Sequence, residues 1–269
     1  MSGWSGTLSH VPDPLATADA PPLLAGLREL RRIAIVPAFN EEGSVARVVG
    51  EVRAFDPGLD VVVVDDGSAD GTCDAALAAG AHVLRLPFNL GIGGAVQTGF
   101  RYAFERGYDL AVRLDGDGQH DAAQLGLVLA PVLDGAADIA VGSRFLAAGD
   151  GCRSSRSRRL GIRILAAVVS RLAGRRVTDP TSGFQALNRS GIALFAHDYP
   201  HDYPEVEATV MVHRHRLRLV EVPVAMRERE AGRSSITTLR SVYYMAKVLL
   251  ALFVGLFRRT VLPQEDARR

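Results

Sequence analysis

The sequence predicts an α/β fold with a mostly parallel central sheet flanked by helices, because short apolar runs alternate with helix-like segments along much of the chain. Hydrophobic residues make up 48% of the 269 positions, enough to bury a sizeable core. Polar and acidic residues follow directly after several of the apolar runs. Parallel sheets bind ligands outside the carboxyl ends of their strands, so these residues predict a site at one edge.

The first two predicted units each end in polar residues. An apolar run over 33–36 stops at Pro37 and is followed by a helical stretch over 44–55. Four valines at 61–64 end in Asp65-Asp66-Gly67-Ser68, before another predicted helix over 73–79. Runs rich in β-branched residues are typical of buried parallel strands.

The pattern continues through three further predicted strands. A run over 82–86 leads through a glycine-rich segment into a predicted helix over 94–106. The run over 110–114 ends in acidic residues, and the run over 139–142 ends at Ser143-Arg144. The same edge of the sheet is therefore expected to carry acidic and basic groups together.

After Arg144 the regular alternation of predicted strands and helices ends. We expect an amphipathic helix with basic ends over 160–169 and one more strand over 217–224. An apolar stretch over 242–257, 16 residues long, is shorter than the roughly 20 residues that a spanning helix needs. It favours a C-terminal amphipathic, membrane-associating helix, with a helix buried on the domain as the alternative.

We predict three parts in the chain: a flexible N-terminal tail over 1–30, a catalytic domain over 31–235, and the C-terminal amphipathic helix with a basic tail over 236–269. The net charge of +1 argues against a nucleic-acid partner. The positive charge is nevertheless clustered, because eight arginines lie between Arg153 and Arg176. The two cysteines form no disulfide framework or zinc spacing, which fits a reducing cytosol.

The segment Asp115-Gly116-Asp117-Gly118-Gln119-His120 carries the clearest chemistry. Two carboxylates one residue apart at a strand end can converge on Mg²⁺ or Mn²⁺, which prefer oxygen ligands and bridge to substrate phosphates. A plain acidic turn is the alternative. No EF-hand is present, because the twelfth loop position has no Glu.

Two other segments are ambiguous. A carboxylate in Asp65-Asp66 can accept a hydrogen bond from a base, although Ser68 or Asp70 can instead cap a helix. Glycines over 89–94 have the wrong spacing for a dinucleotide fingerprint, which excludes NAD binding but permits close approach of a ligand. No nucleophile–base pair is evident.

Together these segments resemble the inverting family 2 glycosyltransferases of the GT-A fold, and among them the dolichyl- or polyprenyl-phosphate sugar synthases. The resemblance covers roughly 32–235 and rests on six segments in the family's order. These are Val36-Pro37-Ala38-Phe39-Asn40-Glu41-Glu42, Val64-Asp65-Asp66-Gly67-Ser68, Asp115-Gly116-Asp117-Gly118-Gln119-His120, Gly142-Ser143-Arg144-Phe145, Asp179-Pro180-Thr181-Ser182-Gly183-Phe184, and Glu221-Val222-Pro223 followed by Arg229-Glu230-Ala231-Gly232.

The resemblance implies a role for each matching position. The metal that neutralises the diphosphate would be bound by Asp115, Asp117 and Gln119. Phosphates would be contacted by Arg144 and Arg229, and the acceptor phosphate by Arg159 and Arg163. Asp179 is implied as the catalytic carboxylate. The nucleoside would be held by Pro37, Phe39, Glu41, Val64 and Asp66.

One departure concerns the diphosphate. Relatives often carry Lys shortly after the Gly-x-Ser that follows the phosphate-binding Arg, whereas this chain has Ser235 there. Arg233 is the candidate substitute, approaching from a different angle.

We therefore expect a glycosyltransferase that moves a hexose from a UDP- or GDP-sugar onto polyprenyl phosphate. It would lie in the cytoplasm, peripheral on the inner face of the plasma membrane, where basic residues attract anionic lipid. A small integral membrane protein is an expected partner.

Two alternatives remain. A saccharide or other soluble hydroxyl acceptor would need a general base, either Asp179 or one of Glu205 and Glu207. The other is a non-catalytic nucleotide-sugar-binding subunit that recruits partners to the membrane.

Overall fold

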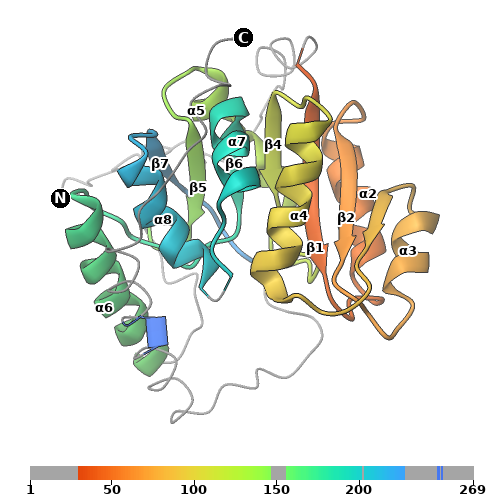
Figure 1. Cartoon of the computed structure of the whole chain (residues 1–269), viewed down its shortest axis with the longest axis horizontal. Coiled ribbons are helices and arrows are strands. Elements are labelled where there is room, and N and C mark those ends of the chain that lie inside the picture. The colour runs from red at the N-terminus through yellow and green to blue at the C-terminus, as the bar shows by residue number, and fades with distance from the viewer. Residues whose placement is uncertain (1–29, 147–155, 202, 228–246, 249, 251–269) are drawn as a thin grey trace, which may run out of the picture.

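A seven-stranded sheet forms the centre of the protein, in the strand order β3-β2-β1-β4-β6-β5-β7. The computed structural model describes residues 30–146, 156–201, 203–227, 247–248 and 250 (Figure 1). The strands are β1 (Arg32–Ala38), β2 (Asp60–Asp65), β3 (His82–Arg85), β4 (Leu110–Arg113), β5 (Ile139–Ser143), β6 (Gln185–Asn188) and β7 (Leu219–Pro223). The helices are α2 (Val45–Phe55), α3 (Thr72–Ala78), α4 (Gly91–Glu105), the short 3₁₀ helix η1 (Ala122–Gln124), α5 (Leu125–Leu133), α6 (Arg156–Ala173), α7 (Arg189–His197) and α8 (Pro204–Arg214).

The predicted α/β class with a mostly parallel sheet is confirmed. Every strand except β6 runs in the same direction, and β6 is antiparallel to both β4 and β5. This reversal has a consequence for the site. The residues that precede β6 lie at the same edge as the residues that follow β4, since Arg113 pairs with Gln185.

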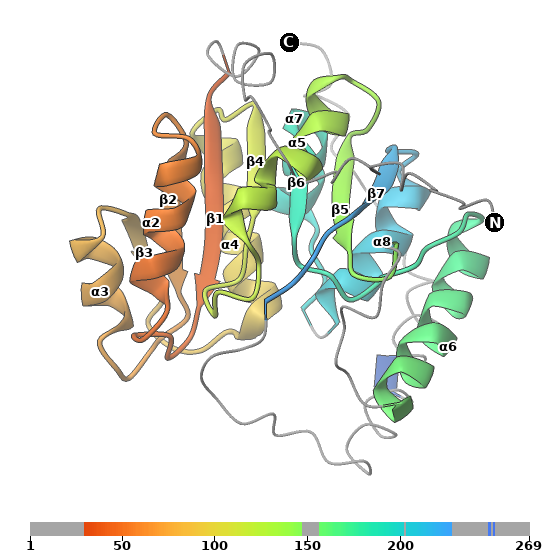
Figure 2. The ribbon, with the colours of Figure 1, turned by 180° about the vertical axis from the view of Figure 1, so that it is seen from behind.

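The core lies on both faces of the sheet. Along β1, Ala34 and Val36 face one cluster with α2 and α5, whereas Ile33 and Ile35 face the other with α4 and α7. This alternation follows from the two-residue period of a strand. Figures 1 and 2 show α4, α7 and α8 covering one face and α2 and α5 the other.

The predicted amphipathic helix is confirmed as α6, which extends beyond 160–169 at both ends. Leu165 and Val169 pack in a third cluster with α8, at the outer end of the sheet (Figure 1). Val248 is completely buried in this cluster, whereas Leu250 is exposed. The rest of the predicted C-terminal helix, and the boundary after residue 235, lie outside the described residues. Within the described part of the chain, no helix is both long and apolar enough to cross a membrane.

Candidate active site

Side chains from four strand ends and one preceding loop meet at the carboxyl edge of the sheet. The segments after β1, β2, β4 and β5 lie there because these strands are parallel, and the loop 179–184 joins them because β6 is reversed. The predicted gathering of acidic and basic groups at one edge is therefore a property of the structure.

The loop after β1 is hydrogen-bonded to the segment between β2 and α3. The backbone N–H of Asn40 donates to Ser68 Oγ at 2.9 Å, and the N–H of Glu41 donates to Thr72 Oγ1 at 2.8 Å. Asn40 has a left-handed φ of 54°, a conformation that asparagine tolerates better than most residues. Phe39, 46% exposed, projects from this loop, so its ring is available to a flat ligand such as a base.

The loop after β2 contains the two candidate helix caps, Ser68 and Asp70, and only Asp70 bonds to the first turn of α3. Ser68 does not cap α3, because its hydroxyl accepts from Asn40 and Gly71 occupies the N-cap position. Asp70 accepts from the backbone N–H of Thr72 at 3.1 Å and so satisfies a donor of the first turn.

Asp66 holds the glycine-rich segment in place. Its carboxylate accepts from the N–H groups of Leu90 at 2.7 Å and Gly91 at 2.9 Å. Burial raises the pKa of Asp66 above its ordinary value, although these hydrogen bonds oppose the shift. A carboxylate offers about four acceptor positions, so further acceptor capacity remains for a base.

Two of the residues implied for the nucleoside have buried side chains. The Val64 side chain is completely buried in the core, and Pro37 is buried as well. The strand's alternation directs the Val64 side chain toward α4, which leaves its backbone as the part that could contact a nucleoside. The implied role of these two residues stays a prediction.

The loop over 115–120 is held by His120, a residue of the sequence motif for which no separate role is expected. The backbone N–H of Asp115 donates to His120 Nδ1 at 3.0 Å, and the buried His120 ring stacks on Phe184 with 5.1 Å between centroids. Asp117 Oδ1 accepts from the N–H of Gln119 at 3.0 Å. Burial lowers the pKa of His120, which keeps its ring neutral and Nδ1 able to accept.

Asp115 is ionised and one third exposed. Burial by itself raises its pKa, but the Nε2 side of the His120 ring, 3.8 Å away, and the charge of the Arg113 guanidinium outweigh that effect and hold the pKa below its ordinary value. Its side chain retains 35% exposure, so solvent or a ligand reaches the carboxylate.

These residues fit a hard divalent cation of the Mg²⁺ or Mn²⁺ type. Asp115, Asp117 and Gln119 offer oxygen atoms at half-exposed positions. In the described part of the chain, no three His, Cys, Asp or Glu side chains are grouped to hold a metal ion. A site with two carboxylates suits Mg²⁺, which typically takes its remaining ligands from water and substrate phosphates.

Arg144 and Asp179 form a bidentate ion pair. Arg144 Nε and Nη2 each donate to the Asp179 carboxylate at 2.7 Å, and Nη2 also donates to Thr181 Oγ1 at 2.7 Å. Asp179 has no exposed side-chain surface, whereas Arg144 keeps 17%. Part of the Arg144 side chain therefore remains accessible at the carboxyl edge of the sheet.

The loop that carries Asp179 is itself anchored by Glu221 of β7. The Glu221 carboxylate accepts from the N–H of Thr178 at 2.8 Å and from the N–H of Asp179 at 2.8 Å. In the sequence, Glu221 is part of a motif, but no role is expected for its side chain.

Three predicted arginines are less defined. Arg163 is exposed on α6, and Arg159 lies on the same helix, but its side chain is outside the described residues. Arg229 also lies outside them. Their implied phosphate contacts remain predictions.

Beneath the loop over 115–120 lies Arg113, which the sequence analysis treated as part of an apolar strand. It is 1% exposed and donates to Glu205 and Tyr199. A charged residue in the run over 110–114 was the signal that could have identified it.

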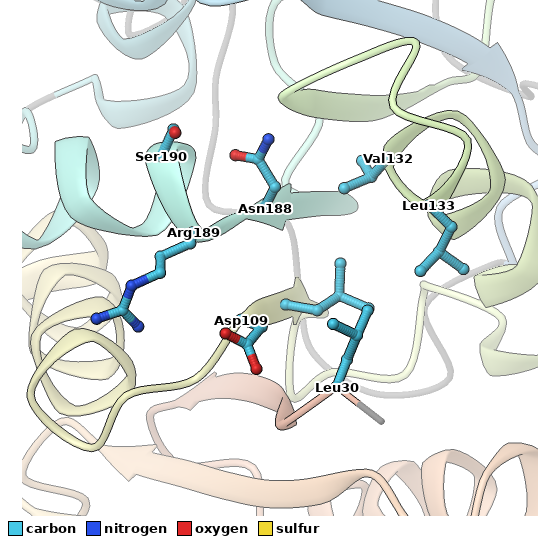
Figure 3. Close-up of a pocket in the computed structure, with 8 residues that line it drawn as sticks. Leu30, Asp109, Val132, Leu133, Asn188, Arg189 and Ser190 are labelled. Carbon is cyan, nitrogen blue, oxygen red and sulfur yellow. The ribbon is translucent and has the colours of Figure 1, made fainter. Parts of the chain in front are cut away.

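A cavity of about 250 Å³ lies at the opposite edge of the sheet (Figure 3). It is lined at the start of β4 and the end of β6, so it is remote from the carboxyl ends. Two of its polar residues already have partners within the protein, Asn188 with Asp138 and Arg189 with the Tyr108 carbonyl. It is therefore not part of the candidate site.

The family model Glycosyl transferase family 2 matches residues 33–194. The chain is 36% identical to an undecaprenyl-phosphate mannosyltransferase of Micrococcus luteus, over 77% of this chain and 88% of that protein. It is 35% identical to a polyprenol monophosphomannose synthase of Mycolicibacterium smegmatis, over 77% of this chain and 81% of that protein.

The structure is similar to glucosyl-3-phosphoglycerate synthase of Mycobacterium tuberculosis, crystallised with Mn²⁺, UDP and glucosyl-3-phosphoglycerate. The TM-score is 0.68 at 21% identity, and the match covers 88% of this chain and 84% of that one. At this identity the likeness bears on the fold, and it agrees with the expected GT-A architecture.

Proposed function

The chain belongs to glycosyl transferase family 2, and we propose that it transfers a hexose from a nucleotide-diphosphate sugar to polyprenyl phosphate. The membership confirms the family expected from the six motifs, and with it glycosyltransferase activity. The acceptor proposal is supported by two relatives, each more than 30% identical, that are an undecaprenyl-phosphate mannosyltransferase and a polyprenol monophosphomannose synthase. A mannose donor is the first to test for the same reason.

The observation that carries the acceptor proposal is the pairing of two of the three candidate bases with arginine. Asp179 accepts from Arg144 Nε and Nη2 at 2.7 Å each, and Glu205 accepts from Arg113 at 2.7 Å. These carboxylate oxygens already accept from guanidinium donors, so they are not free to take a proton from an acceptor hydroxyl. A hydroxyl acceptor requires a base, whereas a phosphate acceptor is already ionised and requires none.

The chain's own residues would then act mainly through charge and position. Asp115, Asp117 and Gln119 would hold the divalent ion, which neutralises the diphosphate leaving group when bound. Arg144, fixed by Asp179 and Thr181, would place a preorganised positive charge near the reacting phosphates. Attack from the side opposite the leaving group would invert the anomeric carbon.

A place at the inner face of the plasma membrane follows from the acceptor. Arg163 and Ile164 are both exposed on α6, which offers a basic and apolar surface to anionic lipid. A small integral membrane protein remains a proposed partner for holding the domain there.

The test is transfer from labelled GDP-mannose, UDP-glucose and other common sugar nucleotides to undecaprenyl phosphate in the presence of Mn²⁺. We expect a lipid-linked product that EDTA abolishes. Asp117→Asn should lose the product, whereas Asp134→Asn, the same change at the exposed C-cap position of α5, should retain it.

Failure to form a lipid-linked product with any donor would overturn the acceptor proposal. Transfer to a soluble saccharide instead would establish the alternative acceptor. Absence of both transfer and donor hydrolysis would favour the non-catalytic subunit.

A further inference from the structure

Arg113 is a buried cation shared by two carboxylates. Its Nη2 atom lies 2.7 Å from Glu205 Oε1 and 3.4 Å from Asp115 Oδ1, and its Nη1 atom donates to the Tyr199 hydroxyl at 3.0 Å. The shorter contact is a strong charge-assisted hydrogen bond, and the longer one is near the limit of hydrogen bonding. The guanidinium is therefore held mainly by Glu205.

The fold does not require a charge at this position. Arg113 is 1% exposed and lies in a strand whose other side chains are apolar. Removing a guanidinium from water costs several kcal/mol, and an apolar residue of similar volume is often as stable or more so. Its Nε atom has no hydrogen-bond partner among the described residues. A costly and incompletely satisfied charge beside a metal-binding loop indicates a role in that loop.

The space between Arg113 and Asp115 admits no other side chain. A Cβ atom at Gly183 would lie 2.9 Å from Arg113 Nη2 and 3.1 Å from Asp115 Oδ1. Gly183 does not have a positive φ, so the absence of a side chain there provides room rather than a special backbone conformation. The two charged groups are thus free to approach each other over the glycine.

Closer approach would harm metal binding. If both nitrogens of Arg113 turned to Asp115, the carboxylate would be engaged by a cation of the protein and would be less available to a divalent ion. Glu205 lies at the second residue of α8 and draws the guanidinium in the other direction. The Tyr199 hydroxyl, from the loop after α7, fixes the opposite nitrogen.

We propose that Glu205 is a positioning residue that retains the Arg113 guanidinium, so that Asp115 remains available to the metal ion. The inference rests on the proposed function in one respect, the assignment of Asp115 as a metal ligand. It gives Glu205 a role that is neither ligand nor base.

The decisive variant is Glu205→Gln, which preserves shape but removes the charge. Asp115 then becomes the nearest carboxylate to Arg113, and the dissociation constant for Mn²⁺ should rise about tenfold, the effect of a competing ion pair worth about 1.4 kcal/mol. Binding of Mn²⁺ alone is measured from the loss of the free-ion signal in electron paramagnetic resonance. Glu105→Gln, at a 66% exposed position on α4, is the matched control and should bind Mn²⁺ like the wild type.

The double variant Glu205→Gln/Arg113→Met separates positioning from other roles. With the competing cation removed, Mn²⁺ affinity should return to the wild-type value or exceed it, and transferase activity should recover in part. A general base at position 205 predicts no recovery of activity in the double variant, and a purely structural role predicts a lower Tm with unchanged Mn²⁺ affinity in Glu205→Gln. Either result would overturn the inference.

Failure of the metal assignment and failure of the proposed role of Glu205 give different experimental results. A wild-type protein that binds no Mn²⁺ would remove the metal assignment on which the inference depends. A wild-type protein that binds Mn²⁺, together with a Glu205→Gln variant of equal affinity, would refute the role of Glu205 and leave the transferase proposal standing.

Discussion

Replacing Asp179 by Asn distinguishes an arginine anchor from a general base. In the structure the Asp179 carboxylate accepts from Arg144 Nε and Nη2 at 2.7 Å each, and from Thr181 Oγ1 at 3.0 Å. An amide retains only one acceptor atom and turns an NH₂ group toward a guanidinium that also donates. Two donors would then face each other in a position where the side chain has no exposed surface.

The expected loss of stability follows from the burial of the pair. Breaking a fully buried ion pair costs about 3–5 kcal/mol, because the remaining charge is uncompensated. Arg144 keeps 17% exposure and can be partly solvated, so about 2–3 kcal/mol is expected here. For a domain of this size that loss lowers the Tm by roughly 4–12 °C.

The assay combines thermal unfolding with steady-state kinetics for Asp179→Asn, Arg144→Gln and the double variant. An anchor predicts that the double variant is less destabilised than the sum of the single variants, since each single change already breaks the same pair. It also predicts that the two single variants lose activity to a similar extent. A Tm unchanged within about 1 °C in Asp179→Asn, together with a fall in kcat of about 10²–10⁴, would refute this reasoning and identify a base.

Three further predictions concern the metal, the loop anchor and acid stability. Asp117→Asn should abolish the Tm increase that Mn²⁺ with GDP or UDP gives the wild type, which is about 2.7 kcal/mol of stabilisation at a hundredfold excess over Kd; an undiminished increase would contradict the metal assignment. Glu221→Gln should lower stability by about 1–3 kcal/mol, since its carboxylate accepts from the backbone of Thr178 and Asp179, and an unchanged midpoint in urea would exclude an anchoring role. Hydrogen bonds from Arg218 lower the pKa of Asp138 to about 2, so its contribution is complete above about pH 4 and is lost as the pH falls toward 2. Asp138→Asn should therefore be less stable than the wild type by about 1 kcal/mol at pH 7, after allowance for the exposure of Arg218, and the difference should shrink at pH 3.

Most of the sheet could be predicted from local pattern. The valines over 61–64 and the runs that became β1, β4 and β5 are apolar on both faces and end abruptly in polar residues. Other elements gave no such signal. The nine residues of α5 are apolar throughout except at Pro131 and Gly126, so they show no helical periodicity. The four residues of β6 are too few to establish a period.

Most residues of the site could also be predicted from the sequence, whereas the ion pairs between them could not. Aspartates after β4 indicated a metal site because short-range spacing alone brings them together. Arg144 and Asp179 are 35 residues apart, and Arg113 and Glu205 are 92 residues apart. The sequence gives Arg144, Asp179 and Glu205 separate expected roles toward a ligand and gives Arg113 none, because nothing local indicates which charges neutralise each other.

The sequence by itself determined the α/β class and the segments that carry the chemistry, because hydrophobic period and strand-end composition are properties of neighbouring residues. The family followed from the resemblance of six motifs in order. The tertiary structure decided which charges face a ligand and which face each other. It did so through the reversed direction of β6, which brings the preceding loop with Asp179 to the edge where Arg144 follows β5, and through α8, which presents Glu205 to Arg113. Such pairings depend on the packing of elements distant in the chain, and that packing is fixed by burial over the whole sheet rather than by any single segment.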